Sequence, residues 1–299
     1  MATNNRIFYA CQAGKISGNT VQGAQSVSVQ SNFNLEQAFQ LGKLGIYDNA
    51  VNNPEVNVTV SKVLDGEDSI YKLATGGGTL VSNANDSCDV ILAIGDDTNS
   101  TISSKQEVVM SGMFLSSVSY TIPTDGFATE ECSFLGDNKI FNATSSVSAP
   151  SADQNVVLRR QHWDESGSEL PTEVSGQNIT NISISADLGR EAMYKLGEFG
   201  PFHRFVNFPL EISCEFEVSS TGLDEVEITQ DVDCQTSLLT EQPILIKMCD
   251  PSDGTTSYSF DLGSGNVLGS VNYQGGDSGG GNATTSFSYT GYNELDISG

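Results

Sequence analysis

Two stretches of the chain alternate strictly between apolar and polar residues. Val27 and Val29 mark the first stretch, and Ile182 and Ile184 mark the second. A period of two places the apolar side chains on one face of a strand, so each stretch predicts a half-buried β-strand. Further alternating or apolar runs follow at 56–60, 90–94, 212–218 and 244–248. The pattern therefore predicts many short strands in both halves of the chain.

The same order of residues returns after an offset of 155. The segment from Ser26 to Pro54 aligns without a gap with the segment from Asn181 to Pro209. The identical positions include Ser28/Ser183, Glu36/Glu191, Leu41/Leu196, Gly42/Gly197, Gly45/Gly200, Val51/Val206 and Asn52/Asn207. The closing hairpins correspond as well: Leu115 and Tyr120 match Leu268 and Tyr273 at an offset of 153, and Ser133 and Gly136 match Ser288 and Gly291 at 155. The chain thus carries two diverged copies of one unit.

One segment of each copy is rich in good helix formers. These segments are 34–41 and 190–196, and Leu35 and Phe39 in the first have the spacing of neighbours on one helix face. Gly42 follows at the place where a helix C-cap belongs, because glycine tolerates the left-handed conformation. We expect one short, core-packing α-helix in each unit.

The strands are separated by clusters of Gly, Asp, Asn and Ser that favour turns. Such spacing is typical of a β-sandwich or barrel. The expected fold class is mainly β, with two tandem β-sandwich or barrel domains that each contain one short α-helix. We place the first domain at 1–144, a linker or extended arm at 145–176, and the second domain at 177–299.

The linker contains a candidate docking element. Trp163, the only tryptophan of the chain, follows closely on Arg159 and Arg160. Tryptophan and arginine are enriched among residues that dominate binding energy at interfaces, so these three residues are candidates for contacts between subunits. A tryptophan partly buried in its own domain is equally compatible with the pattern.

Charge narrows the classes of partner. The formal net charge is −25, from 38 acidic and 13 basic residues. Binding to nucleic acid or to an anionic membrane through charge is excluded, because phosphate contacts require clusters of Lys and Arg. Solubility is the simple explanation of the acidic excess, and a surface that repels DNA is the sharper one. We expect no secretory leader within 1–25 and no membrane-spanning helix.

The sequence lacks the usual parts of an active site. His162 and His203 are its only histidines, and its six cysteines have no CxxC spacing. Neither the HExxH pattern nor the P-loop pattern is present. We therefore expect no catalytic residues, no cofactor, no metal site and no enzymatic activity.

The repeated unit resembles the tail tube proteins of tailed bacteriophages. The resemblance is carried by the stretch 111–130, by the apolar opening Ile7–Ala10 and by the segment Asn32–Gln37. It implies that domains pack side by side, that their sheets join into a ring of usually six domains, and that stacked rings form a hollow tube for DNA. With two such domains per chain, three chains would close one pseudo-hexameric ring.

The resemblance also implies a location and partners. We expect a virion structural protein of the tail, assembled in the host cytoplasm, that binds other copies of itself and other tail proteins. Genomic DNA would pass through the lumen without specific binding, and no membrane is involved. Two alternatives stay open: a baseplate hub, distal tail or neck protein of the same fold, or a secreted carbohydrate-binding or adhesin module with tandem β-sandwiches.

Overall fold

The computed structural model describes residues 12–95, 104–142, 147, 150, 156–220, 222, 226, 240–250, 254–276 and 281–299. Strands dominate these residues, with two short α-helices and one 3-10 turn among them. The expectation of a mainly β fold is confirmed. Ile7–Ala10, one part of the tail tube resemblance, lies outside the described residues.

Eight antiparallel strands follow one another across the main sheet. In spatial order they are β3 (Ala24–Asn32), β6 (Glu55–Val63), β9 (Thr129–Gly136), β8 (Ser104–Pro123), β11 (Asn178–Asp187), β14 (Glu211–Ser219), β18 (Thr284–Tyr292) and β17 (Val267–Gln274). The first part of the long strand β8 leads into a branch made of β7 (Ser87–Gly95), β10 (Ile140–Asn142), β1 (Gln12–Ile16) and β2 (Asn19–Thr20). One sheet therefore runs from the first half of the chain into the second.

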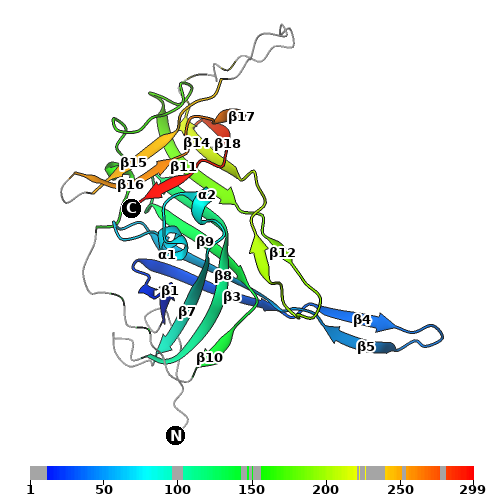
Figure 1. Ribbon diagram of the computed structural model, residues 1–299. Helices are drawn as coiled ribbons and strands as arrows, with labels where there is room; N and C mark the ends of the chain where they lie inside the picture. The colour runs from blue at the N-terminus through cyan, green and yellow to red at the C-terminus, as the bar shows by residue number, and fades with distance from the viewer. Residues whose placement is uncertain are drawn as a thin grey trace.

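The remaining elements lie around this sheet (Figure 1). A smaller three-stranded sheet consists of β15 (Leu245–Cys249), β16 (Thr256–Asp261) and β19 (Asp296–Ser298). Two separate hairpins consist of β4 (Leu35–Phe39) with β5 (Ile46–Val51), and β12 (Glu191–Met193) with β13 (His203–Phe205). The helices are α1 (Ile70–Thr75) and α2 (Leu80–Asn83), and η2 (Arg160–His162) is a 3-10 turn.

The core lies on one face of the main sheet. Because side chains alternate along a strand, every second residue of the eight strands points to this face, and most of these residues are buried. Helix α1 and the smaller sheet contribute to the same cluster of buried residues. The rings of Tyr120 on β8 and Phe260 on β16 lie 4.7 Å apart between centroids. Residues of both halves therefore share one apolar core.

The segments predicted as helices, 34–41 and 190–196, form hairpin strands instead. Leu35 lies opposite Val51 in the first hairpin, and Glu191 lies opposite Phe205 in the second. A helix of two or three turns is only marginally stable by itself, whereas these segments gain cross-strand partners downstream. Gly42 and Gly197 do adopt the left-handed conformation, with φ of 83° and 91°, but at the hairpin tips.

The α-helices occur elsewhere, and only in the first half of the described chain. Helix α1 begins after Ser69, whose side chain accepts a hydrogen bond from the backbone N–H of Lys72, and it ends at Gly76 in the left-handed conformation. These are ordinary start and stop residues of a helix. The expectation of one helix in each unit is wrong for the described part of 177–299.

A buried carboxyl group fixes α1 to the sheet. Glu130 on β9 is fully buried. It accepts hydrogen bonds from the backbone N–H groups of Ile70 and Tyr71, at 2.7 and 2.9 Å, and from the hydroxyl of Tyr120 at 2.8 Å. Burial raises the pKa of Glu130 above its ordinary value, and the hydrogen bonds oppose this effect only in part. Lys62, on the neighbouring strand, is also fully buried and pairs with Asp65 at 3.2 Å.

The raised pKa of Glu130 makes the stability of the fold depend on pH. Above about pH 4.3, the folded chain holds this proton more tightly than the unfolded chain, so rising pH removes stability until the folded pKa is passed. We expect the melting temperature of the native protein, relative to that of Glu130→Gln, to fall as the pH rises above the ordinary pKa of a glutamate. The exposed neighbour Glu131→Gln is the matched control, and a pH-independent difference for Glu130→Gln would contradict the account.

Candidate assembly interface

The two halves of the main sheet meet where β11 pairs with β8. The pairing is antiparallel and runs from Asn181 opposite Pro123 to Asp187 opposite Ser117. Ile184 of β11 lies opposite Tyr120 of β8, and both side chains are buried. The opening strand of the second half thus adds directly to a strand of the first half. We call this pairing the internal junction.

The two halves use the same strand order and the same irregularities of register. The order is β3-β6-β9-β8 in the first half and β11-β14-β18-β17 in the second. The register shifts between Ala24 and Ser26 in β3, between Ile179 and Asn181 in β11, between Leu115 and Ser117 in β8, and between Leu268 and Ser270 in β17. These positions differ by 155 residues for β3 and β11, and by 153 for β8 and β17. The offsets of the sequence repeat are therefore confirmed by the strand pairing.

The eight-stranded run ends in two open edges. Among the described strands, β3 pairs only with β6, and β17 pairs only with β18. By the repeat, β3 is the counterpart of β11, and β17 is the counterpart of the part of β8 that forms the internal junction. The counterparts of the two strands that pair at the internal junction therefore form the two edges of the run, and neither is paired on its outer side with another described strand. A row of unpaired backbone donors and acceptors at an edge favours pairing with another strand.

The hairpin β12–β13 of the second half packs against the first half, next to the internal junction. Just before it, the backbone N–H of Leu188 donates to the carbonyl of Ser116 at 2.9 Å. The Nε of Arg190 donates to the carbonyl of Leu115 at 2.7 Å, and its guanidinium lies 5.4 Å from the centroid of the Phe114 ring. Partial burial lowers the pKa of Arg190 to about 10, so its side chain stays charged at neutral pH.

Two further contacts come from the second strand of this hairpin. The ring of His203 meets that of Phe114 edge to face, with centroids 5.0 Å apart. Arg204, which is buried, pairs with Asp137 of the first half. The arm of the second half is thus fastened to the first half by aromatic and charged contacts.

The hairpin β4–β5 has no such surface beneath it. Its strand residues are all exposed, and it projects away from the rest of the molecule (Figure 1). Phe33 is 63% exposed, whereas its counterpart Leu188 is fully buried; Val51 is 54% exposed, whereas its counterpart Val206 is 7% exposed. An isolated two-stranded hairpin is marginally stable in water, and large exposed apolar patches mark interaction sites.

The second face of the main sheet is polar. It is formed by the residues that alternate with the buried ones, mostly Ser, Thr, Asn and Gln. Its charged residues in the eight strands are Glu55, Glu131, Asp187, Glu211, Glu215 and Glu217. No Lys or Arg of described side-chain placement joins them, because Lys62 is buried on the core face. Among the strand residues whose side chains are described, the charges on this face are therefore all negative.

The docking residues predicted in the linker lie against the body of the chain. Arg159 places its guanidinium 4.5 Å from the centroid of the Phe127 ring, and Arg160 donates to the carbonyl of Thr124 at 3.3 Å. Both are exposed, whereas Trp163 is half-buried and packs against the core. A docking role for these three residues stays a prediction. Sequence reasoning missed the exposed hairpin β4–β5, because it assigned 34–41 to a core helix.

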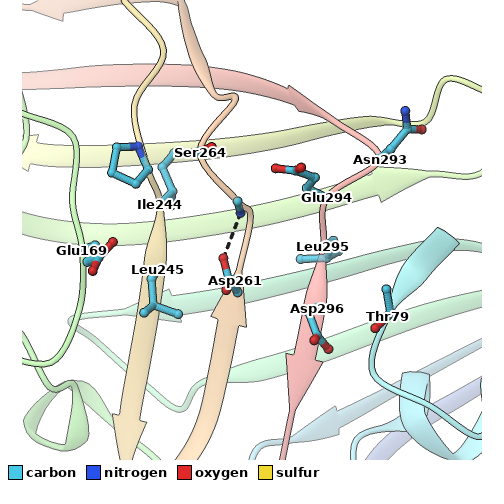
Figure 2. Close-up of a pocket in the computed structure, with 12 residues that line it drawn as sticks. Thr79, Glu169, Ile244, Leu245, Asp261, Ser264, Asn293, Glu294, Leu295 and Asp296 are labelled. Carbon is cyan, nitrogen blue, oxygen red and sulfur yellow. Dashed lines mark hydrogen bonds between the residues drawn. The ribbon is translucent and has the colours of Figure 1, made fainter. Parts of the chain in front are cut away.

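A hollow of about 630 Å³ lies beside the smaller sheet (Figure 2). Its lining includes the carboxylates Glu169, Asp261, Glu294 and Asp296, and Asp261 accepts a hydrogen bond from the backbone N–H of Gly263 at 2.9 Å. Among the described residues, no group of three or more His, Cys, Asp and Glu is placed to hold a metal ion.

None of the described helices has the length and apolar character needed to cross a membrane.

Comparison with known proteins gives structural likenesses only. No family model matches the chain, and no curated protein matches its sequence. The cap that terminates the tube of the anti-feeding prophage shares 13% identity at a TM-score of 0.39, over 48% of this chain and 95% of that one. The sheath-tube complex of an extracellular contractile injection system, in its extended state, shares 14% identity at a TM-score of 0.38, with the same coverage.

The burial difference between counterparts predicts unequal effects of truncation. Leu188→Ala removes a fully buried side chain and should lower the free energy of unfolding by about 2–5 kcal/mol. Phe33→Ala should change it by about 0.5 kcal/mol or less in the unassembled chain, because its side chain is exposed. Urea denaturation at high dilution measures both values, and equal losses would contradict the assignment of Phe33 to an unoccupied interface.

Proposed function

We propose that the chain is a structural subunit of a phage-like tail tube, in which three copies close one pseudo-six-fold ring and rings stack into a tube. Each copy would contribute two tandem domains, at 1–144 and 177–299. One observation carries the proposal: the strands paired at the internal junction recur as the open edges β3 and β17. Because its two open edges are counterparts of strands that pair with each other, one chain could pair its β17 edge with the β3 edge of another copy.

Such a contact is head-to-tail, because it joins two different edges. A head-to-tail contact gives a closed ring when the rotation between copies closes, and an open helical array when it does not. The internal junction already relates two units within one chain. If the junction between chains has the same geometry, every unit meets its neighbours in the same way, and closure pairs both open edges of the eight-stranded run. The number of six units per ring is taken from the tail tube resemblance.

The polar face of the main sheet is suited to the inside of this ring. The opposite face is covered by α1 and the smaller sheet, so the polar face is the one left bare. Its carboxylates, unaccompanied by Lys or Arg, would repel the phosphate backbone of DNA. We propose that DNA passes along this face without binding. The protein would then belong to the tail of a virion, assemble in the host cytoplasm and contact other tail proteins.

Negative-stain microscopy and native mass measurement of the purified protein test this function. We expect three-chain rings with six lobes that stack into tubes as concentration rises. Rings that never stack would favour a hub, distal tail or neck role of the same fold. A stable monomer at every concentration would contradict the proposal.

Charge reversal tests the role of the polar face. The triple variant Glu131→Lys, Glu215→Lys and Glu217→Lys places cations where DNA would pass, and assembled tubes should then bind DNA with an affinity that falls steeply with salt. The matched control is the same charge change outside the eight strands, at Asp86, Glu165 and Glu241, which are exposed. Fluorescence anisotropy with labelled DNA measures binding, and equal binding by both variants would contradict a lumenal position of this face.

A further inference from the structure

We infer that β17 of one chain pairs antiparallel with β3 of the next in a defined register, and that hairpin β4–β5 then seats on the neighbour as β12–β13 seats within the chain. The inference rests on the proposed self-assembly and specifies its contact surface. The surface that hairpin β4–β5 would contact thus belongs to a second copy of this chain.

The register follows from the internal junction by the two repeat offsets. Positions of β11 are carried to β3 by subtracting 155, and positions of β8 are carried to β17 by adding 153. Ser185 opposite Ser119 therefore becomes Gln30 opposite Asn272, and Ile184 opposite Tyr120 becomes Val29 opposite Tyr273. The complete set of pairs is Ser26–Gly276, Val27–Gly275, Ser28–Gln274, Val29–Tyr273, Gln30–Asn272, Ser31–Val271 and Asn32–Ser270.

At its centre this register matches like with like on both faces, whereas towards its ends Ser31 meets Val271 and Val27 meets Gly275. Val29 meets Tyr273 on the core face, where Val27, Val29 and Val271 already pack against the core. Gln30 meets Asn272 on the polar face. A slip of one residue would place the apolar residues of β3 opposite the polar residues of β17, so the alternation itself selects the register.

Burial shows that β17 lacks the neighbour that β8 has. Tyr120 is 1% exposed at the internal junction, whereas its counterpart Tyr273 is 41% exposed. Leu188 and its counterpart Phe33 show the same contrast in exposure, since Leu188 is buried and Phe33 is exposed. By the repeat, the N–H of Phe33 would donate to the carbonyl of Gly269 of the neighbour, as the N–H of Leu188 donates to that of Ser116.

The junction between chains differs from the internal one in its chemistry. Arg190 corresponds to Leu35, and Arg204 corresponds to Asn49, so the exposed hairpin lacks the two arginines of its counterpart. Asp137, which pairs with Arg204, corresponds to Tyr292, which is exposed. At these positions the contact between chains is therefore uncharged where the internal one is charged. This difference favours the alternation of first and second halves around the ring, because Arg204 finds its carboxylate only on a first half.

Cysteine pairs test the register directly. Gln30→Cys with Asn272→Cys places one thiol on each open edge, at positions expected to lie opposite each other in neighbouring chains. Ser119→Cys with Ser185→Cys is the in-chain control, because these residues lie opposite each other at the internal junction. Gln30→Cys with Gln274→Cys is the off-register control, since a diagonal neighbour lies beyond the reach of a disulfide. Chains with single substitutions account for the native cysteines.

The expected result on a non-reducing gel is a covalent dimer and trimer for the Gln30→Cys, Asn272→Cys variant, with the ladder ending at the trimer. The off-register pair should yield roughly tenfold less cross-linked product under the same mild oxidation. If rings form and the in-chain control closes its disulfide while the matched pair stays uncross-linked, the register is wrong and the ring proposal stands. If the in-chain control closes and every variant stays monomeric, the proposed function itself fails.

Discussion

The structure depends on the antiparallel pairing of β8 with β11. This pairing turns two four-stranded runs into one sheet, and its register decides which side chains reach the common core. Ile184 and Tyr120 point to the core, whereas Ser185 and Ser119 point to the polar face. Because the two runs are copies of one unit, the pairing also determines what the outer edges are: a second set of the same two strands, each with one side unpaired.

A duplicated chain of this kind shows one interface in two states. Within the chain the interface is occupied, and Leu188 and Val206, which flank the hairpin β12–β13, are buried. At the edges it is unoccupied, and the counterparts Phe33 and Val51 are exposed. The backbone needs no rearrangement to explain this contrast, since the register of both hairpins is the same. What differs is the presence of a neighbouring strand, and in the proposed ring the replacement of two arginines by uncharged residues would adapt the outer copy to a neighbour from another chain.

Part of this organisation can be predicted from the local sequence. The alternation at Val27, Val29, Ile182 and Ile184 predicts strands, and the offsets of the sequence repeat recur in the register shifts of the strand pairing. Helix and hairpin were confused at 34–41 because Leu35 and Phe39 suit both, and only the partner strand 46–51 decides between them. Helix α1 is absent from the sequence-based prediction, although Ser69 and Gly76 are good start and stop residues of a helix. The internal junction joins 117–123 to 181–187, and alternation within a strand does not say which distant edge it meets.

A cryo-EM reconstruction of assembled rings, traced strand by strand, tests the central claim most directly. Each chain supplies eight strands to the main sheet, so three chains would form a barrel of 24 strands. The account predicts that β8–β11 junctions within chains alternate with β17–β3 junctions between chains, in the same register, with the polar face toward the lumen. A ring in which β3 and β17 of adjacent chains stay apart, or in which the core face lines the lumen, would contradict it.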